Sequence, residues 1–143
     1  MTATANLNEL ANTLGTGVIV SENCLIITPE SLLSAAKQLK EPMGLDFEYL
    51  DMITAADYPD YFELIYRFLS LKKNESVTVK TRVGKENPTV PSLTPLWHGA
   101  DFQEREIYDL FGIVFTGHPN LKRIMLWEGF EGYPLRKDYG IDA

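Results

Sequence analysis

The sequence predicts an α+β fold, in which helices cover one face of a small, largely antiparallel sheet and an extended arm follows at the C-terminus. The domain is predicted by segments whose apolar residues repeat with the period of a helix, and by segments in which apolar and polar residues alternate as in a half-buried strand. The arm is predicted by the loss of both periods after Gly117. We expect residues 1–95 to form the domain, and residues 96–143 to add one further helix and the arm.

Two helices and a hairpin are expected in the N-terminal part. The first helix covers residues 7–14, and its apolar stripe is formed by Leu7, Leu10, Ala11 and Leu14. A hairpin over residues 18–27 turns at a polar Ser-Glu-Asn sequence. The second helix opens with Thr28 as N-cap and Pro29 at its first position, and residues 42–44 end it. Its apolar side is formed by Leu32, Leu33, Ala36 and Leu39.

Three strands are expected next, in the sequences LDFEY (45–49), FELIYRF (62–68) and VTVKTRV (77–83). The residues expected to share one buried face are Leu45, Phe47 and Tyr49, then Phe62, Leu64, Tyr66 and Phe68, then Val77, Val79, Thr81 and Val83. Such alternation places one face of the sheet on a core and the other in water, and the short connections suit antiparallel neighbours.

The pattern changes after the third strand. Three prolines and many polar residues between positions 84 and 95 predict a loop or linker without regular pairing. Asp101 and Glu104 have the spacing of a capping box, which predicts a third helix with Gly112 as its C-terminal cap. The apolar stripe of that helix is Ile107, Leu110, Phe111 and Val114.

Charge and hydropathy exclude several classes of protein. The net charge is −7, and the excess of acidic groups falls in the first 116 residues. An acidic body argues against binding to nucleic acid or anionic lipid, because both need clustered Lys and Arg. No apolar run approaches the roughly 18 residues of a membrane helix, so any membrane association is expected to be indirect.

The single cysteine and the N-terminus add two expectations. Cys24 lies in an apolar segment and is expected to be buried in a strand, with a reactive thiol as the alternative. One cysteine allows neither an internal disulfide nor a cysteine-ligated cluster within the chain. The first residues resemble neither a secretory signal nor a transit peptide, which favours a bacterial cytoplasmic location.

The densest group of polar side chains is Glu104, Arg105, Glu106 and Asp109. On a helix, Glu104 and Glu106 point in nearly opposite directions, so they cannot share a proton or a metal. Glu106 and Asp109 lie on one face, but Arg105 is one turn before Asp109 and is expected to neutralise it. A capped helix with this ion pair is therefore favoured over a pair of carboxylates that performs chemistry.

The histidines do not suggest a metal site. His98 and His118 lack the spacing of metal ligands, and His118 is expected to make hydrogen bonds or an interface contact in the turn before Pro119. The sequence contains no nucleotide-binding or hydrolase motif. A free-standing enzyme that uses Glu106, Asp109 and His118 is therefore the weakest alternative.

Residues 117–143 combine apolar anchors with glycines, prolines and two basic pairs. The anchors are Leu121, Ile124, Leu126, Trp127, Phe130, Tyr133 and Leu135. They are too many for a solvated tail and too irregular for a helix, whereas large apolar and Arg side chains on an extended segment suit the groove of a partner. The alternative is an arm that folds back on its own domain.

Several short sequences, in this order, resemble a known family. They are DYP (57–59), LSLKKN (69–74), VPSLTPLW (90–97), EREIYDLFG (104–112), GHP (117–119), LKRI (121–124) and GYPLRKDY (132–139). Together they are similar to the C subunit of NADH–quinone oxidoreductase, respiratory complex I, also called the thirty-kilodalton subunit. The chain departs from the family where its tail stops just after KDY and where Gly129 replaces a more usual acidic residue. These departures affect individual contacts and leave the resemblance intact.

The resemblance implies a mixed sheet and a structural subunit that binds no cofactor itself, because FMN, the iron–sulfur clusters and the quinone belong to partner subunits. It implies a non-catalytic part of an enzyme, a proton-pumping translocase that passes electrons from NADH to quinone in the respiratory chain. The implied partners are complex I subunits D and B, which hold the quinone site and the terminal iron–sulfur cluster respectively. The implied location is the cytoplasmic side of the bacterial inner membrane, reached through the complex. The alternative is the equivalent subunit of an energy-converting membrane-bound hydrogenase.

The resemblance also implies that the arm wraps around the quinone-site subunit. The expected subunit interface consists of Glu104, Arg105, Glu106, Asp109, His118, Pro119, Arg123, Pro134, Leu135, Arg136, Lys137 and Asp138. Arg123, Arg136 and Lys137 are expected to pair with carboxylates of the quinone-site subunit, so replacing Arg136 and Lys137 with Ala is expected to release the chain from the complex.

Overall fold

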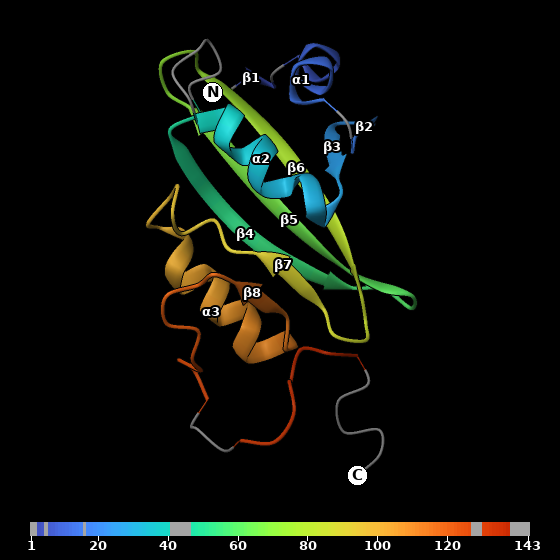
Figure 1. The fold of residues 1–143 in the computed structure, drawn as a ribbon, viewed down its shortest axis with the longest axis vertical. Coiled ribbons are helices and arrows are strands. Elements are labelled where there is room, and N and C mark those ends of the chain that lie inside the picture. The colour runs from blue at the N-terminus through green and yellow to red at the C-terminus, as the bar shows by residue number, and fades with distance from the viewer. Residues whose placement is uncertain (1–2, 5, 16, 41–46, 127–129, 138–143) are drawn as a thin grey trace.

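The computed structural model describes residues 3–4, 6–15, 17–40, 47–126 and 130–137 and arranges them in two layers (Figure 1). The strands of the main sheet are β1 (Ala3–Thr4), β2 (Val18–Ser21), β3 (Cys24–Ile27), β4 (Tyr49–Asp57), β5 (Tyr61–Ser70) and β6 (Glu75–Gly84). The helices are α1 (Leu7–Leu14), α2 (Pro29–Lys40) and α3 (Ala100–Phe111), and a second, two-stranded sheet is formed by β7 (Thr89–Pro91) and β8 (Val114–Thr116).

The main sheet has the strand order β2-β3-β6-β5-β4, and β1 also pairs with β6. Three pairings join strands that follow one another along the chain, β2 with β3, β4 with β5 and β5 with β6, and all three are antiparallel. The two pairings of β6 with β1 and β3 are parallel. The sheet is therefore mixed and largely antiparallel, and the α+β fold expected from the sequence is confirmed.

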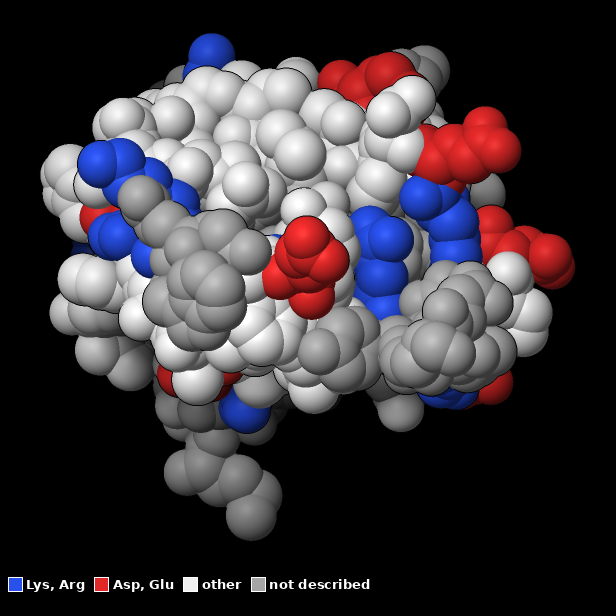
Figure 2. All heavy atoms as spheres, turned by 90° about the horizontal axis from the view of Figure 1, so that it is seen from below, with Lys and Arg blue, Asp and Glu red and all other residues white. Residues whose placement is uncertain are grey.

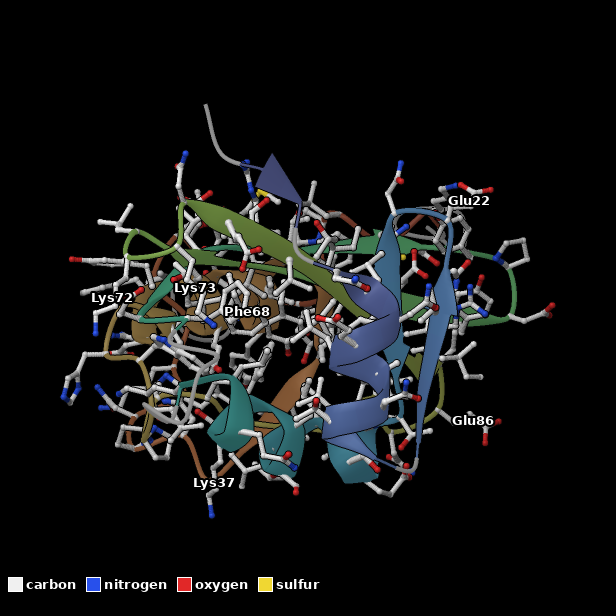
Figure 3. The ribbon with its side chains drawn as sticks, turned by 90° about the horizontal axis from the view of Figure 1, so that it is seen from above. Glu22, Lys37, Phe68, Lys72, Lys73 and Glu86 are labelled. Carbon is white, nitrogen blue, oxygen red and sulfur yellow. The ribbon has the colours of Figure 1, made fainter. Side chains whose placement is uncertain are left out.

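One face of the sheet carries the apolar core. On β5, Phe62, Leu64, Tyr66 and Phe68 are each no more than 1% exposed, as their alternation predicted. Helices α1 and α2 lie on this side of the sheet, and Phe68 points toward the helix layer (Figure 3). The ring of Phe68 lies 4.9 Å from that of Trp97, just before α3. Burial of side chains this large supplies the main stabilisation of the body.

Most of the N-terminal predictions are confirmed. Helix α1 ends at Leu14, where the N–H of Gly15 donates to the carbonyl of Ala11. The hairpin is β2–β3, and Cys24 is buried within it. Helix α2 begins at Pro29 as predicted, whereas residues 42–44, expected to end it, lie outside the described residues.

The prediction of a strand over residues 45–49 is wrong in its described part, because Phe47 and Glu48 do not lie in a strand, while Leu45 and Asp46 lie outside the described residues. The strand in this region is β4, which begins at Tyr49, and Tyr49 is 53% exposed while Phe47 is buried. The pairing of β4 with β5 shifts its register between Leu50 and Met52. A bulge of this kind breaks the alternation that would have revealed the strand in the sequence.

The prediction that prolines prevent pairing between residues 84 and 95 is also wrong, because β7 pairs with β8 in parallel. The carbonyl of Pro88 accepts from the N–H of Val114, and the N–H of Ser92 donates to the carbonyl of Thr116. Pro88 thus accepts a hydrogen bond through its carbonyl, a group that proline retains although it lacks an N–H. Pro91 lies between Pro88 and Ser92, so neither of these two hydrogen bonds needs the N–H that it lacks.

Helix α3 lies along the edge strand β4 (Figure 1). The side chain of Gln103 accepts the N–H of Ile53 at 2.7 Å, so α3 satisfies a backbone donor of that edge. Gly112 caps the helix in the left-handed conformation, as predicted. The prediction of a capping box is wrong, since Gly99 occupies the N-cap and Glu104 points into the core. Val114 lies in β8 rather than on the helix.

The core includes apolar residues from both sides of position 95, among them Leu64, Val90, Trp97 and Phe115. The division into residues 1–95 and 96–143 stays a prediction.

Candidate subunit interface

Two carboxylates on α3, those of Glu104 and Asp109, are fully buried. Each accepts hydrogen bonds from a different segment of the chain. Because buried charges need partners, these two contacts determine which segments pack against the helix.

Glu104 holds the loop between β7 and α3. One carboxylate oxygen accepts from the hydroxyl of Ser92 at 2.6 Å, and the other accepts from the N–H of Leu93 at 2.8 Å. Burial raises the pKa of Glu104, and the two donors offset part of that increase. Burial, and then the nearby charge of Glu104, also raise the pKa of Tyr66 well above its ordinary range.

Asp109 holds the C-terminal arm, residues 117–143. Its Oδ2 accepts the consecutive backbone N–H groups of Ile124, Met125 and Leu126 at 3.0, 2.7 and 3.0 Å. Its Oδ1 lies 3.3 Å from Nε of Arg123, as an ion pair. Three N–H donors and one ion-paired guanidinium from the arm therefore surround this carboxylate, which fixes this part of the arm against α3.

The predicted pairing of Arg105 with Asp109 is wrong, because Arg123 occupies that place. Arg105 instead donates from Nε to the carbonyl of Lys122 at 3.4 Å and lies over the ring of Phe102. The first contact joins α3 to the arm, and the second stays on the surface of α3. Neither involves the carboxylate of Asp109.

Tyr133 lies against two arginines. The distances from its ring centre to Cζ of Arg123 and Cζ of Arg136 are 4.8 and 4.9 Å. Arg123 also donates to the carbonyls of Phe130 and Gly132 at 2.8 and 2.7 Å. Arg123 therefore connects the two described parts of the arm with each other, and the ring of Tyr133 lies between Arg123 and Arg136.

Gly112 provides the space for this arrangement. A Cβ at this position would lie 2.7 Å from Tyr133 and 2.8 Å from Arg136. Arg136 donates from Nε to the carbonyl of Phe111 at 2.5 Å, which brings the arm onto the C-terminal end of α3. Gly112 thus serves both the left-handed cap and the close approach of the arm.

Asp57, at the end of β4, binds the arm at Lys137, nearer to the C-terminus than the contacts of Asp109. Its Oδ2 accepts the backbone N–H of Lys137 at 2.8 Å, and its Oδ1 is bound by the ammonium group of Lys85. Burial acts to raise the pKa of Asp57, but the hydrogen bonds and charges of Lys85 and Lys137 outweigh it, so the pKa is lowered.

His118 makes hydrogen bonds in the turn that enters the arm. Its Nδ1 accepts the N–H of Asn120 at 2.9 Å, so Nε2 carries the proton and lies 2.9 Å from the carboxylate of Asp101. An open depression of about 340 Å³ lies beside this turn, lined by Thr94, Pro95, His98, Asp101, Gly117 and Pro119. Among the residues that the structure describes, no group of three or more His, Cys, Asp or Glu side chains is placed to hold a metal.

The structure brings some of the predicted interface residues together and separates others. Asp109, Arg123 and Arg136 meet at the C-terminal end of α3, where Leu135 also lies. Glu104 faces the loop after β7, and Glu106 is exposed. Asp138 is outside the described residues. The alternative of an arm that folds back on its own domain fits these contacts, whereas pairing of its arginines with a partner stays a prediction.

Sequence reasoning missed three residues of this arrangement as interface residues: Asp57, Gly112 and Tyr133. Asp57 belongs to the DYP sequence, but nothing local connects it with Lys137, 80 positions away. The sequence predicts Gly112 only as a cap, and Tyr133 only as one of several apolar anchors. The tertiary fold brings these three residues to their contacts, and the spacing of residues along the sequence does not reveal those contacts.

These features define a class of protein: a two-layer α+β domain whose C-terminal arm is fastened to its last helix. The chain belongs to the family described as the respiratory-chain NADH dehydrogenase 30 Kd subunit, whose model matches residues 25–143. The family predicted from the motifs is therefore confirmed.

Relatives from bacteria and from fungal mitochondria are similar to this chain in sequence. The NADH-quinone oxidoreductase C subunit of Roseiflexus sp. (strain RS-1) is 39% identical over 133 residues, which cover 91% of this chain and 76% of that protein. The same subunit of Moorella thermoacetica is 44% identical, over 83% of this chain and 80% of that protein. The mitochondrial NADH dehydrogenase [ubiquinone] iron-sulfur protein 3 of Candida albicans is 44% identical, but this chain covers only 43% of its length. These relatives are subunits of an enzyme complex.

Two solved structures share the fold. A trypsin-resistant fragment of Nqo5 superposes with a TM-score of 0.69 at 30% identity, over 80% of this chain and 96% of the fragment. A chain of the membrane-bound sulfane sulfur reductase, an archaeal respiratory membrane complex, also gives a TM-score of 0.69, at 22% identity over 94% of this chain and 83% of that chain. Of the helices that the structure describes, none combines the length and apolar character needed to span a membrane.

Proposed function

We propose that this chain is a structural subunit of a proton-pumping NADH–quinone oxidoreductase and that it binds no redox cofactor itself. In this proposal it positions the subunits that carry electrons, namely the one at the quinone site and the one with the terminal iron–sulfur cluster. It lies in the peripheral part of the complex, on the cytoplasmic side of the bacterial inner membrane.

The observation that carries this proposal is that the buried carboxylates of α3 accept hydrogen bonds from other segments of the same chain. Glu104 and Asp109, the buried acidic groups of α3, accept hydrogen bonds from Ser92, Leu93 and the arm. Carboxylates that are bound by the chain's own donors, and in Asp109 also by the ion pair with Arg123, support packing rather than chemistry on a substrate. The family relatives, which are subunits of a larger enzyme, support the same function.

Affinity purification of the tagged chain from its native membranes tests the proposal. The quinone-site and iron–sulfur subunits should be recovered with it, together with NADH-driven quinone reduction, and the isolated chain should have no such activity. Recovery of the chain alone would contradict the proposal.

The fold is shared with a chain of a respiratory complex of another kind, so the fold alone does not identify the electron donor. The energy-converting hydrogenase is therefore kept as the second candidate. A co-purified nickel-containing subunit and hydrogen evolution, without NADH oxidation, would favour it.

A further inference from the structure

The arm separates its side chains into an inner and an outer set. Arg123 is only 11% exposed at its side chain, and Leu121 packs against the core. By contrast, Ile124, Met125 and Leu135 are 37%, 62% and 52% exposed. One of the basic side chains expected to bind a partner, that of Arg123, is thus turned inward. Three apolar side chains of the arm are turned outward: the expected anchors Ile124 and Leu135, and Met125.

The backbone of the three outward residues is nevertheless fixed. The N–H groups of Ile124 and Met125 donate to Oδ2 of Asp109, and the N–H of Leu135 donates to the carbonyl of Leu110 at 3.0 Å. Asp109 and Leu110 are neighbours in the chain, so both attachment points lie at the same end of α3. Three large apolar side chains are therefore presented to solvent on a backbone held in place by the domain.

The charges around this surface indicate what it binds. Arg123 and Arg136 are occupied by carbonyls and by the ring of Tyr133 within the chain. Lys122 and Lys137 are exposed, and they flank the three apolar side chains along the sequence. On the lower face of the molecule, Lys and Arg side chains lie in two groups with an acidic side chain between them, and further acidic side chains lie beside the right-hand group (Figure 2).

We propose that Ile124, Met125 and Leu135 form the docking surface of the arm, and that their partner is an apolar groove with carboxylates on its rim, on another subunit. This inference rests on the proposed function and deepens it. Arg123 and Arg136 are then positioning residues, which shape the arm before the partner binds. Pre-shaping reduces the entropy lost on association, so the apolar contacts contribute more of their burial to affinity.

Two variants of the tagged full chain separate these roles. In the outer variant, Ile124→Gln, Met125→Gln and Leu135→Gln remove the apolar surface without touching the backbone contacts. In the inner variant, Arg123→Gln and Arg136→Gln remove the internal contacts. Ile19→Gln and Leu71→Gln serve as a matched control, because these side chains are 65% and 64% exposed but lie outside the arm. For each protein, recovery of the other subunits from native membranes and the midpoint of thermal unfolding of the isolated chain are measured.

We expect the outer variant to lose recovery by at least about tenfold while its thermal midpoint stays that of the parent chain. The inner variant should show a lower thermal midpoint, and the control should match the parent in both measurements. The inference is overturned if the inner variant loses recovery at an unchanged midpoint while the outer variant assembles normally, because the arginines would then be the contacts. It is also overturned if both variants assemble like the parent. Failure of the parent chain to recover any subunit would instead overturn the proposed function, and the inference with it.

Discussion

Different forces hold the two regions of this protein in place. The body consists of the sheets and helices α1 to α3, and the arm is the C-terminal segment, residues 117–143. The body buries a continuous apolar cluster between sheet and helices, in which the β5 aromatics are almost completely removed from water. The arm contributes little to that cluster and is held by a few polar contacts, at Asp109, Phe111 and Asp57. Apolar burial is distributed over many residues, whereas each polar contact depends on one group. The arm should therefore be detachable by single substitutions that leave the body folded.

The largest effect is expected in the body. Phe68→Ala removes a ring with no exposed surface, so it should lower the free energy of unfolding by about 3–5 kcal/mol. Urea unfolding followed by tryptophan fluorescence measures this. Phe102→Ala is the matched control, because Phe102 is 66% exposed and should change stability by no more than about 0.5 kcal/mol. Equal losses in the two variants would contradict the assignment of the core.

Asp109→Ala should release the arm. It removes the acceptor of three N–H groups, at an expected cost of about 1–3 kcal/mol. In hydrogen exchange, amides of residues 124–126 should lose protection while those of β5 keep theirs. Glu106→Ala, at an exposed position of the same helix, should leave both unchanged. Simultaneous loss of protection in β5 would show that arm and body are not separable.

Gly112→Ala should also loosen the arm, at the place where Tyr133 and Arg136 approach the end of α3. The φ of +79° disfavours a side chain by about 1–2 kcal/mol, and the new Cβ would also displace Tyr133. Limited proteolysis should cut the arm faster in this variant than in the parent chain. Gly99→Ala is the control, since φ there is −63° and nothing lies within 4 Å of its Cβ, so its cleavage rate should be unchanged.

The smallest effect concerns pH. Because the folded state lowers the pKa of Asp57, its contribution is present above the ordinary value of 3.8 and is lost as the pH falls below it through the folded-state pKa. The stability difference between the parent chain and Asp57→Asn should therefore be constant near neutral pH and shrink in acid. Thermal midpoints of both proteins across this range measure it. A difference that grows with acidification would contradict the lowered pKa.

Local patterns predict the elements whose residues face one consistent environment. Helices α1 and α2, the β2–β3 hairpin, β5 and β6 all follow a clear period, and Gly112 is placed by its conformational freedom. Strand β4 is misplaced by sequence reasoning because its register shift interrupts the alternation. The β7–β8 pair escapes detection because each strand has three residues and its partner lies beyond α3.

The composition of the site could be predicted, but its connections could not. The sequence selects residues of α3 and the arm as polar and apolar anchors of an interface, which stays a prediction, and helical spacing pairs Asp109 with Arg105 rather than with Arg123. Spacing along a helix describes neighbours on its surface, whereas Asp109 is buried and meets a segment that follows a sharp turn. Nothing local relates Asp57 to Lys137.

The sequence by itself determined the family, the α+β class and the irregular, anchor-rich nature of the arm, because motifs, periods and composition are local properties of the chain. Only the tertiary structure decided which charges are used internally and which side chains face outward. Those choices depend on long-range contacts, such as the enclosure of Asp109 by three N–H groups and one guanidinium from the arm. A buried carboxylate takes whichever donors the fold brings to it, and their identity is fixed only when the chain has closed around it.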